Sequence, residues 1–198
     1  SSSVGHPSLA GSGSVSGSDY THLLEDTGHL RGTVGSGTWS AGGTMITARC
    51  CLGGFGTQNA SVGYGGGADA NSVYCTEEYN GVSWAASGDF TAGGIDGANY
   101  QGGNGVGTQN AGLAAAHGWA KNTAREYNGS VWSAVTSAIT ALIVAGQTGT
   151  QNAALRMGGR PTCTCTEEYN GSTWTVGGAL SQGRYRLSSA GLQNSGLV

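Results

Sequence analysis

The segment GTQNAALRMGGRPTCTCTEEYNGSTW, Gly149–Trp174, contains both motifs that repeat along this 198-residue chain. The first motif, GTQNA, is marked by its glutamine, and the second, TEEYNGSTW, by the tryptophan that ends it. The successive copies place these residues at Gln58, Gln109, Gln151 and Gln193, and at Trp39, Trp84, Trp132 and Trp174. Spacings of 42–51 residues indicate about four copies of one structural unit.

Each unit has the pattern of several short strands. Ala153–Met157 is apolar, follows the GTQNA turn and precedes a Gly-Gly pair, which is typical of a buried strand. The stretch after the tryptophan, through Ala179–Leu187, is expected to form the last strand. Four short strands in about 45 residues are typical of one propeller blade.

The Asn-Gly of the second motif favours a two-residue hairpin with a type I′ turn, which needs a positive φ at both central residues. With Asn80-Gly81 as this turn, Tyr79 opposes Val82 and Glu77 opposes Trp84. The tyrosine and the tryptophan then share one face of the hairpin. We expect these repeat positions to hold the fold, together with Tyr127, Tyr169, Glu78, Glu126 and Glu168 at the equivalent places.

Composition excludes several other classes of protein. Glycine makes up 39 of the 198 residues, and it costs about 1 kcal/mol relative to alanine inside a helix, which argues against a helical bundle. Collagen is excluded because the glycines lack a period of three. The chain has only 8 Lys and Arg residues and a net charge of −3, so we expect no nucleic-acid partner. The longest apolar run, around Ala138–Ala145, is too short for membrane insertion.

The order of a double glycine, a tyrosine and a tryptophan resembles the kelch repeat. The matching residues are Gly65-Gly66, Tyr79 and Trp84, and Gly158-Gly159, Tyr169 and Trp174, while the middle unit keeps Tyr127 and Trp132 without the double glycine. Over roughly residues 31–198, the chain is also similar to repeat proteins of marine tailed bacteriophages, cyanophages among them, that are virion components. The resemblance implies an all-β fold, a small β-propeller of about four kelch-like, four-stranded repeats.

Two regions are expected. Residues 1–30, rich in Ser and Gly, form either an N-terminal arm or a decayed first strand, and residues 31–198 form the propeller. Because the chain ends in another copy of the first motif, residues 175–198 are expected to complete the unit that begins at 31–39 and so close the ring. The alternatives are an open array whose end units pair with another chain, and a repeat that continues beyond Val198.

The adjacent carboxylates Glu77-Glu78 and Glu167-Glu168 are the best candidates for acid–base catalysis. They recur with the repeat, however, and neighbours on a strand face opposite sides, whereas a catalytic site is normally unique. The middle unit even has Arg125 at the first position. We therefore expect no catalytic site. The residues expected instead to accept hydrogen bonds, from backbone or from an arginine such as Arg49 or Arg184, are Glu78, Glu126 and Glu168.

The Gln-Asn pairs of the first motif suggest either a polar ring that binds a sugar or, more commonly, turn formation and cross-blade hydrogen bonding. The four histidines, His6, His22, His29 and His117, lack the spacing of metal ligands, so neither a metal nor another cofactor is expected.

The five cysteines are an odd number, which argues against a disulfide framework. We expect buried free thiols that behave as small apolar groups. Cys50 and Cys51, as neighbours on a strand, are expected to point to opposite faces.

The sequence as a whole favours a non-enzymatic structural protein of a phage virion: a capsid decoration, a head knob or a tail-fibre module that aids host attachment. Its location would be the virion surface or the extracellular medium, and its partners other virion proteins, copies of itself and host-surface glycans. One alternative is a carbohydrate- or receptor-binding module, which an exposed aromatic platform would indicate. The others are a subunit of an extracellular filament and a kelch-type sugar oxidase, which needs Tyr, His and Cys ligands around copper.

Overall fold

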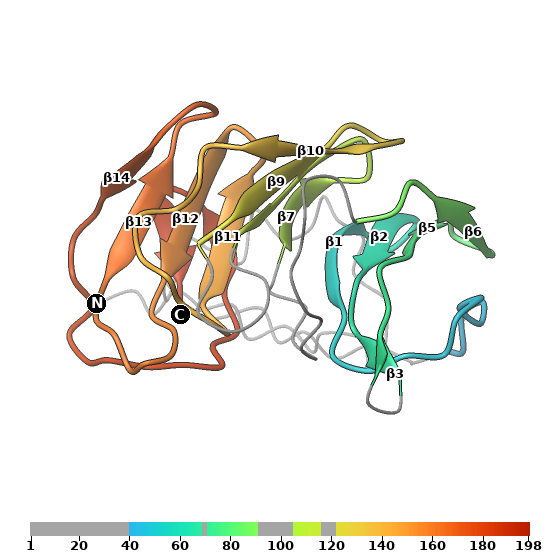
Figure 1. The fold of residues 1–198 in the computed structure, drawn as a ribbon, viewed down its shortest axis with the longest axis horizontal. Helices are drawn as coiled ribbons and strands as arrows, with labels where there is room; N and C mark the ends of the chain where they lie inside the picture. The colour runs from blue at the N-terminus through green and yellow to red at the C-terminus, as the bar shows by residue number, and fades with distance from the viewer. Residues whose placement is uncertain (1–39, 69–70, 91–104, 116–121) are drawn as a thin grey trace, which may run out of the picture. The chain divides into compact units, whose positions relative to one another are not determined.

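The computed structural model describes residues 40–68, 71–90, 105–115 and 122–198 (Figure 1). Every regular element in these ranges is a β-strand, which confirms the all-β prediction for this part of the chain. The same ranges contain no helix long and apolar enough to cross a bilayer. All of the strands belong to the compact unit Ala41–Val198. The predicted arm at 1–30 and the decayed hairpin that ends at Trp39 lie outside the described residues.

Three sheets have four strands each, joined as antiparallel meanders. Sheet 1 consists of β1 (Gly53–Thr57), β2 (Ala60–Tyr64), β5 (Thr76–Tyr79) and β6 (Trp84–Ser87). Sheet 2 consists of β7 (Gly105–Thr108), β8 (Ala111–Ala115), β9 (Ala124–Tyr127) and β10 (Trp132–Val135). Sheet 3 consists of β11 (Gly146–Thr150), β12 (Ala153–Met157), β13 (Thr166–Tyr169) and β14 (Trp174–Val176). The predicted strand Ala153–Met157 is thus confirmed as β12.

Two short hairpins complete the described fold. β3 (Gly67–Ala68) and β4 (Asn71–Ser72) form one between β2 and β5. β15 (Ala190–Leu192) and β16 (Ser195–Leu197) form the other, which we call the C-terminal hairpin. Its turn is the last copy of the first motif, so it corresponds to the first two strands of a fourth unit. Within the described residues this unit has no third or fourth strand, and no closed ring is seen there.

The register of the second hairpin in each sheet differs from the prediction. Tyr79 pairs with Trp84, so the loop contains four residues, 80–83, and the predicted two-residue turn is wrong. The register moves by two residues, and an even shift leaves every side chain on its predicted face. Tyr79 and Trp84 therefore still lie together, with their ring centroids 5.1 Å apart.

The wider loop is stabilised by its asparagine. Asn80 Oδ1 accepts the backbone N–H groups of Val82 and Ser83, each at 2.9 Å, and the Asn80 N–H donates to the Ser83 carbonyl. In this loop only Gly81 has a positive φ, of 93°, whereas a type I′ turn needs two such residues. The asparagine side chain thus stabilises a four-residue loop. This side-chain bonding competes with the two-residue turn that Asn-Gly also favours.

The prediction of a strand at Ala179–Leu187 is also wrong. The fourth strand begins at the repeat tryptophan itself, as β14 shows, and Arg184 makes only an isolated bridge to Cys163. Just after β14, the Gly177 N–H donates to the Thr166 carbonyl at 2.9 Å, and Thr166 Oγ1 donates to the Gly178 carbonyl at 2.7 Å. These bonds tie the chain to the start of β13, where the strand ends.

The two sequence motifs meet at one corner of each sheet. Asn152 of the first motif lies against Gly171 of the second, where an added Cβ would be 3.3 Å from the Asn152 Cβ. In sheet 2 the fit is tighter, since a Cβ on Gly129 would be 2.8 Å from Asn110 Oδ1. Gly171 and Gly129 also have φ values of 90° and 91°, which disfavour any other residue. The motifs therefore recur together because they form one packed corner.

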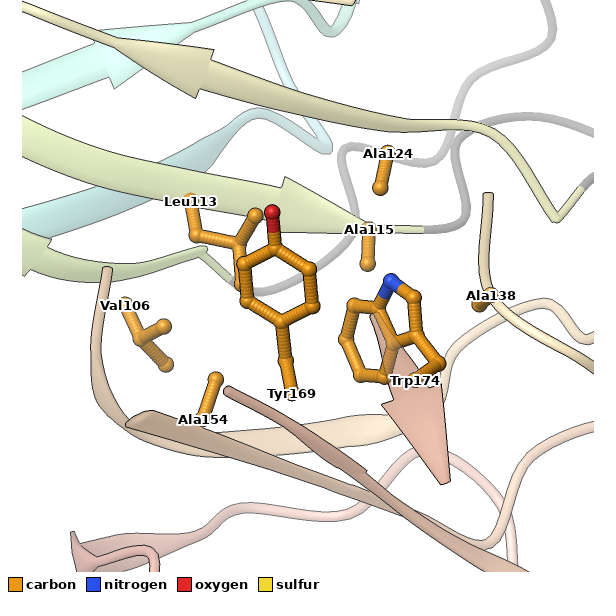
Figure 2. Close-up of a cluster of buried hydrophobic side chains, with 8 residues drawn as sticks. All are labelled: Val106, Leu113, Ala115, Ala124, Ala138, Ala154, Tyr169 and Trp174. Atoms are coloured by element: carbon orange, nitrogen blue, oxygen red, sulfur yellow. The ribbon is translucent and has the colours of Figure 1, made fainter. Parts of the chain in front are cut away.

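Successive sheets pack through their first strands: β1 contacts β7, β7 contacts β11, and β11 contacts β15. The core between sheets 1 and 2 is mainly aromatic and consists of Phe55, Val62, Tyr64, Phe90, Ala114, Tyr127 and Trp132. The core between sheets 2 and 3 has smaller residues around Tyr169 and Trp174, namely Val106, Leu113, Ala115, Ala124, Ala138 and Ala154 (Figure 2). The repeat tyrosine and tryptophan of sheets 2 and 3 thus lie buried against the preceding sheet.

A left-handed backbone residue recurs seven positions before the repeat glutamine. Cys51, Val144 and Arg186 occupy this position with φ values of 57°, 50° and 57°. The middle unit has Gly102 at this position, outside the described residues, and glycine is the residue type that tolerates a left-handed backbone without steric cost. The Arg186 N–H donates to the Val144 carbonyl at 3.0 Å, so this position also links successive units.

Candidate functional site

The first carboxylate of the TEEY motif is buried in an ion pair. In sheet 1, Glu77 Oε1 lies 3.1 Å from Arg49 Nη2, and both side chains are buried. Glu77 also accepts the backbone N–H groups of Ile46 and Thr47, at 2.8 and 3.1 Å. Glu77 therefore holds the loop that precedes β1, a structural use of a carboxylate.

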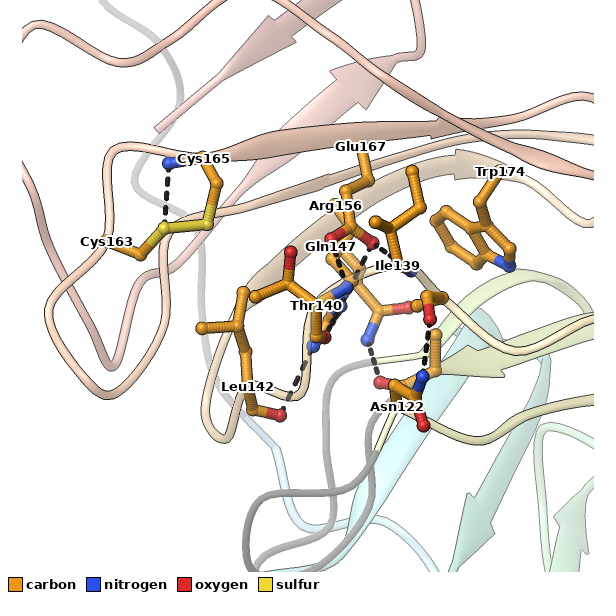
Figure 3. Close-up of polar contacts among 12 residues, drawn as sticks. Asn122, Ile139, Thr140, Leu142, Gln147, Arg156, Cys163, Cys165, Glu167 and Trp174 are labelled. Carbon is orange, nitrogen blue, oxygen red and sulfur yellow. Dashed lines mark hydrogen bonds and ion pairs between the residues drawn. A yellow bond between two sulfur atoms is a disulfide. The ribbon is translucent and has the colours of Figure 1, made fainter.

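The equivalent carboxylate in sheet 3 has the same surroundings (Figure 3). Glu167 Oε2 lies 3.1 Å from Arg156 Nη1, and Glu167 accepts the N–H groups of Ile139 and Thr140 at 3.1 and 2.7 Å. Burial lowers the pKa of the Arg156 guanidinium, and the Glu167 charge acts in the opposite direction. Arg156 lies on β12, whereas Arg49 precedes β1. Sequence alignment of the repeats cannot reveal this match, because the two arginines occupy different repeat positions.

Sheet 2 reverses the sign of this buried charge. Arg125 stands at the position of Glu77 and Glu167, is 2% exposed, and lies over the Phe90 ring at 5.6 Å from its centroid. Burial lowers the pKa of Arg125. Among the described residues, its Nε and Nη1 atoms have no hydrogen-bond partner and its guanidinium has no ion pair. The stacking on Phe90 is the interaction that stabilises this cation.

The second carboxylate of the motif links neighbouring sheets through a tyrosine. Tyr127 donates its hydroxyl to Glu78 Oε1, and Tyr169 donates to Glu126 Oε1 at 3.0 Å. Burial, together with these carboxylates, raises the pKa of each tyrosine to about 12. The Glu168 carboxylate receives no such bond from the described residues.

The prediction that the second carboxylate accepts from backbone or from an arginine is therefore wrong for Glu78 and Glu126, whose donors are tyrosine hydroxyls. Arg49 pairs with the first carboxylate, Glu77, and the Arg184 backbone bonds to the Cys163 carbonyl. The reason is strand alternation: the first carboxylate faces the loop of its own sheet, and the second faces the tyrosine of the next sheet. The neighbouring carboxylates do not converge on one site, so no catalytic pair is formed by them.

The repeat glutamines clamp the preceding sheet. Gln109 Nε2 donates to the Tyr79 carbonyl at 3.0 Å, and Gln151 Nε2 donates to the Tyr127 carbonyl at 3.0 Å. Gln193 Nε2 repeats the contact with the Tyr169 carbonyl at 2.9 Å. Each amide also donates to a second-strand carbonyl, that of Ser61, Gly112 or Ala154. Gln58, the first in the series, is exposed.

The repeat tryptophans use their indole N–H groups in the same structural way. Trp84 donates to the Gly43 carbonyl at 3.0 Å, Trp132 to Thr76 Oγ1 at 2.9 Å, and Trp174 to the Thr136 carbonyl at 3.0 Å. An indole that is bonded in this way is a rigid packing element. Trp39 lies outside the described residues.

The cysteines differ from the expected buried thiols. Cys163 and Cys165 form a disulfide within one loop, while Cys50 and Cys51 are exposed and Cys75 is half-buried. Cys75 Sγ lies 2.8 Å from Arg49 Nη1. The prediction of five free, buried thiols is therefore wrong. The cause for Cys163 and Cys165 is local, since the turn brings their Cα atoms within 5.3 Å.

One depression of about 200 Å³ lies where the first strands converge. Residues of β1, β7, β11 and β15 line it, together with Ser189 just before β15. Its wall includes the glycines Gly56, Gly107, Gly149 and Gly191, each with a φ between 110° and 115°. At these four positions backbone forms the wall, and no charged residue contributes to the lining. Such a site suits a small neutral ligand or water.

The described residues offer neither a metal centre nor an aromatic platform. They contain no group of three His, Cys, Asp or Glu side chains that would hold a metal. All four histidines lie outside the described ranges. Tyr185, 49% exposed, is the one aromatic side chain among the large exposed apolar residues of the described part. The aromatic residues of the repeat are instead used between the sheets.

Comparisons with known proteins add no family to these observations. No protein-family model matches the chain. A search of curated proteins also finds no matching sequence.

Proposed function

We propose that the protein is a small kelch-like β-propeller with a mechanical role, a structural and surface component of a bacteriophage virion. The observation that carries this proposal is the glutamine clamp, in which the amides of Gln109, Gln151 and Gln193 each donate to two carbonyls of the preceding sheet. The clamp recurs at every junction between described sheets. A chain that uses its repeated polar residues in this way is built as a rigid body.

The surroundings of the carboxylates support a non-enzymatic role. Glu77 and Glu167 are bound in buried ion pairs, and Glu78 and Glu126 accept tyrosine hydroxyls. A general acid or base must exchange a proton with a substrate, whereas Glu77 and Glu167 are buried in ion pairs and the half-buried Glu78 and Glu126 are bonded to tyrosines.

Ring closure is part of the proposal. Residues 31–39 align with the third and fourth strands of the other units and would add to the C-terminal hairpin. Leu197 is 75% exposed, whereas Val62 and Leu113, at the equivalent positions, are 2% and 0% exposed. In sheets 1 and 2 that position is covered by the next sheet. In the proposed closed ring, sheet 1 would be the next sheet and would cover this leucine.

The assignment to a virion follows from the resemblance of residues 31–198 to phage repeat proteins. Capsid decoration, a head knob and a tail-fibre module are the three placements we propose, with other virion proteins and copies of the chain as partners. The test is to purify native particles through a density gradient and quantify the chain by mass spectrometry. It should remain with the particles at a fixed ratio to the major shell protein. Recovery only in the soluble fraction would contradict a virion role.

A role in attachment to host glycans is a second candidate, favoured by the neutral depression between the first strands. Gln147, Thr148 and Ser189 supply its polar side chains. Saturation-transfer NMR with neutral monosaccharides should detect contact, and Ser189→Trp should abolish it by filling the depression. Ser188→Trp, on the exposed neighbour, is the matched control. Equal signals in both variants would exclude the depression as the binding site.

A further inference from the structure

The exposed arginines of the described residues lie on neighbouring segments of the chain. They are Arg160, Arg184 and Arg186, and the other arginines of the described part have buried side chains. The whole chain carries a net charge of −3, so this gathering of positive charge is a local feature and does not follow from composition.

Backbone hydrogen bonds hold these segments side by side. The Gly159 N–H donates to the Arg184 carbonyl at 2.7 Å, which places Arg160 close to Arg184. The segment 143–144 then joins the other two. Arg160 exchanges two bonds with its first residue, at 2.8 and 3.2 Å, and the Arg186 N–H donates to the carbonyl of its second at 3.0 Å. The three exposed arginines are thus fixed on one part of the surface.

An exposed aromatic ring lies between two of these cations in the sequence. Tyr185, between Arg184 and Arg186, is 49% exposed, and so combines an accessible apolar ring with a polar hydroxyl. We call the surface formed by Arg160, Arg184, Tyr185 and Arg186 the basic patch. Within the described part of the chain, it is the place where exposed cations and an exposed aromatic ring occur together.

The fold itself does not neutralise this charge. The repeat position of Arg184 is occupied in the first unit by Arg49, whose side chain is buried and lies 3.1 Å from Glu77 Oε1. Arg184 and Arg186, by contrast, make no ion pair with the described residues. The described hydrogen bonds of these two residues involve backbone groups, which leaves the guanidinium groups to another role.

We propose that the basic patch binds a carboxylated polysaccharide, one that contains uronic-acid residues. This inference rests on the candidate role in attachment to host glycans, and it uses residues other than those that line the neutral depression. The planar guanidinium matches a carboxylate with two parallel hydrogen bonds, and the tyrosine ring offers an apolar face to a sugar ring. Nucleic acid fits less well, because its affinity depends on many cation–phosphate contacts and the patch has few cations.

The experiment is isothermal titration calorimetry of the full chain with oligogalacturonate, and with neutral dextran of the same length as the comparison. The oligogalacturonate should bind and the dextran should not. Arg184→Gln and Arg186→Gln should each weaken binding about tenfold, the equivalent of one charge-assisted hydrogen bond. Tyr185→Ala should also weaken it, although the net charge is unchanged.

A matched control separates the patch from the overall charge. Ser133→Glu, at an exposed position of β10, lowers the net charge by one, as each arginine substitution does, and should retain the wild-type affinity. An equal loss in Ser133→Glu would show that net charge, and not the basic patch, governs binding. Circular dichroism should show that each variant is folded, because the described bonds of Arg184 and Arg186 are made by the backbone.

Three results with the wild-type chain would overturn the proposal. They are no binding of oligogalacturonate, tighter binding of polyglutamate, which would indicate an acidic protein partner, and tighter binding of single-stranded oligothymidylate, which would indicate a nucleic acid. The virion role is tested independently by the ratio of the chain to the shell protein in purified particles, so failure of one proposal can be told from failure of the other.

Discussion

Gln151 Nε2 of sheet 3 donates to the Tyr127 carbonyl of sheet 2 at 3.0 Å, and the same amide bonds the Gly112 carbonyl at 3.1 Å. One side chain thus holds two strands of a neighbouring sheet. The contact recurs at Gln109 and Gln193, which makes it the connection that repeats along the molecule.

Replacement of this amide should weaken the whole array. Gln151→Ala removes two hydrogen bonds and should lower the free energy of unfolding by about 1–3 kcal/mol, the usual cost of leaving such acceptors unpaired. Gln182→Ala, at an exposed glutamine, should change it by less than about 0.5 kcal/mol. Urea denaturation followed by tryptophan fluorescence measures both. Equal effects would show that the clamp contributes nothing specific.

One substitution at two buried arginines should have opposite consequences. Arg156→Met leaves Glu167 buried without its counter-ion and should cost about 3–5 kcal/mol. Arg125→Met removes a buried cation that has no ion pair with the described residues, and should leave stability unchanged or higher. Thermal unfolding by calorimetry compares the two. A large loss on Arg125→Met would mean that its charge is paired.

Alanine in place of Gly112 should destabilise the middle unit, although sheet 3 has an alanine at the equivalent position. Ala154 stands at the repeat position of Gly112, yet a Cβ on Gly112 would lie 2.0 Å from the Phe55 ring. Gly112→Ala should therefore cost about 1–3 kcal/mol through overpacking. Adding Phe55→Leu should recover part of that loss, because it removes the clashing ring. A double variant no more stable than Gly112→Ala would disprove this steric cause.

Alkaline pH should unfold the protein through its buried tyrosines. The pKa values of Tyr127 and Tyr169 are raised to about 12 in the folded state, against 10 for a free phenol. A raised folded pKa means that stability is complete below pH 10 and is lost as pH rises from 10 to 12. Absorbance at 295 nm and circular dichroism should show phenol ionisation together with unfolding. Ionisation of all tyrosines near pH 10 without unfolding would contradict the assignment.

The strands that the sequence predicts well are those with local signals. Ala153–Met157 is apolar, lies between turn residues, and is β12 as expected. The sequence does not predict the hairpin register correctly. The Asn80 side chain bonds to the loop backbone, and this bond favours the four-residue loop over the two-residue turn. The alternation of residues along a strand indicates which face each side chain occupies. These faces are retained when the register shifts by two residues.

The polar contacts are harder to predict because they join residues far apart in sequence. Nothing in the repeat alignment indicates that Arg49 and Arg156 reach equivalent carboxylates from different positions. The left-handed backbone at Cys51 is likewise hard to predict, because its one sequence signal is the glycine at the equivalent position of another unit, Gly102. The assembled fold, with its specific backbone angles, decides these contacts.

We propose that the units close into one ring, in which residues 31–39 would lie beside β16. Leu155 pairs with Glu168 in sheet 3, so in the proposed ring the residues at the equivalent repeat positions, Leu197 and Thr33, would pair in the same way. The decisive measurement is the mass of the product formed on oxidising Thr33→Cys with Leu197→Cys, in a chain whose free Cys50, Cys51 and Cys75 are replaced by serine. A closed ring predicts a monomer with one internal disulfide between positions 33 and 197. A disulfide-linked dimer, or two thiols that stay free, would contradict it.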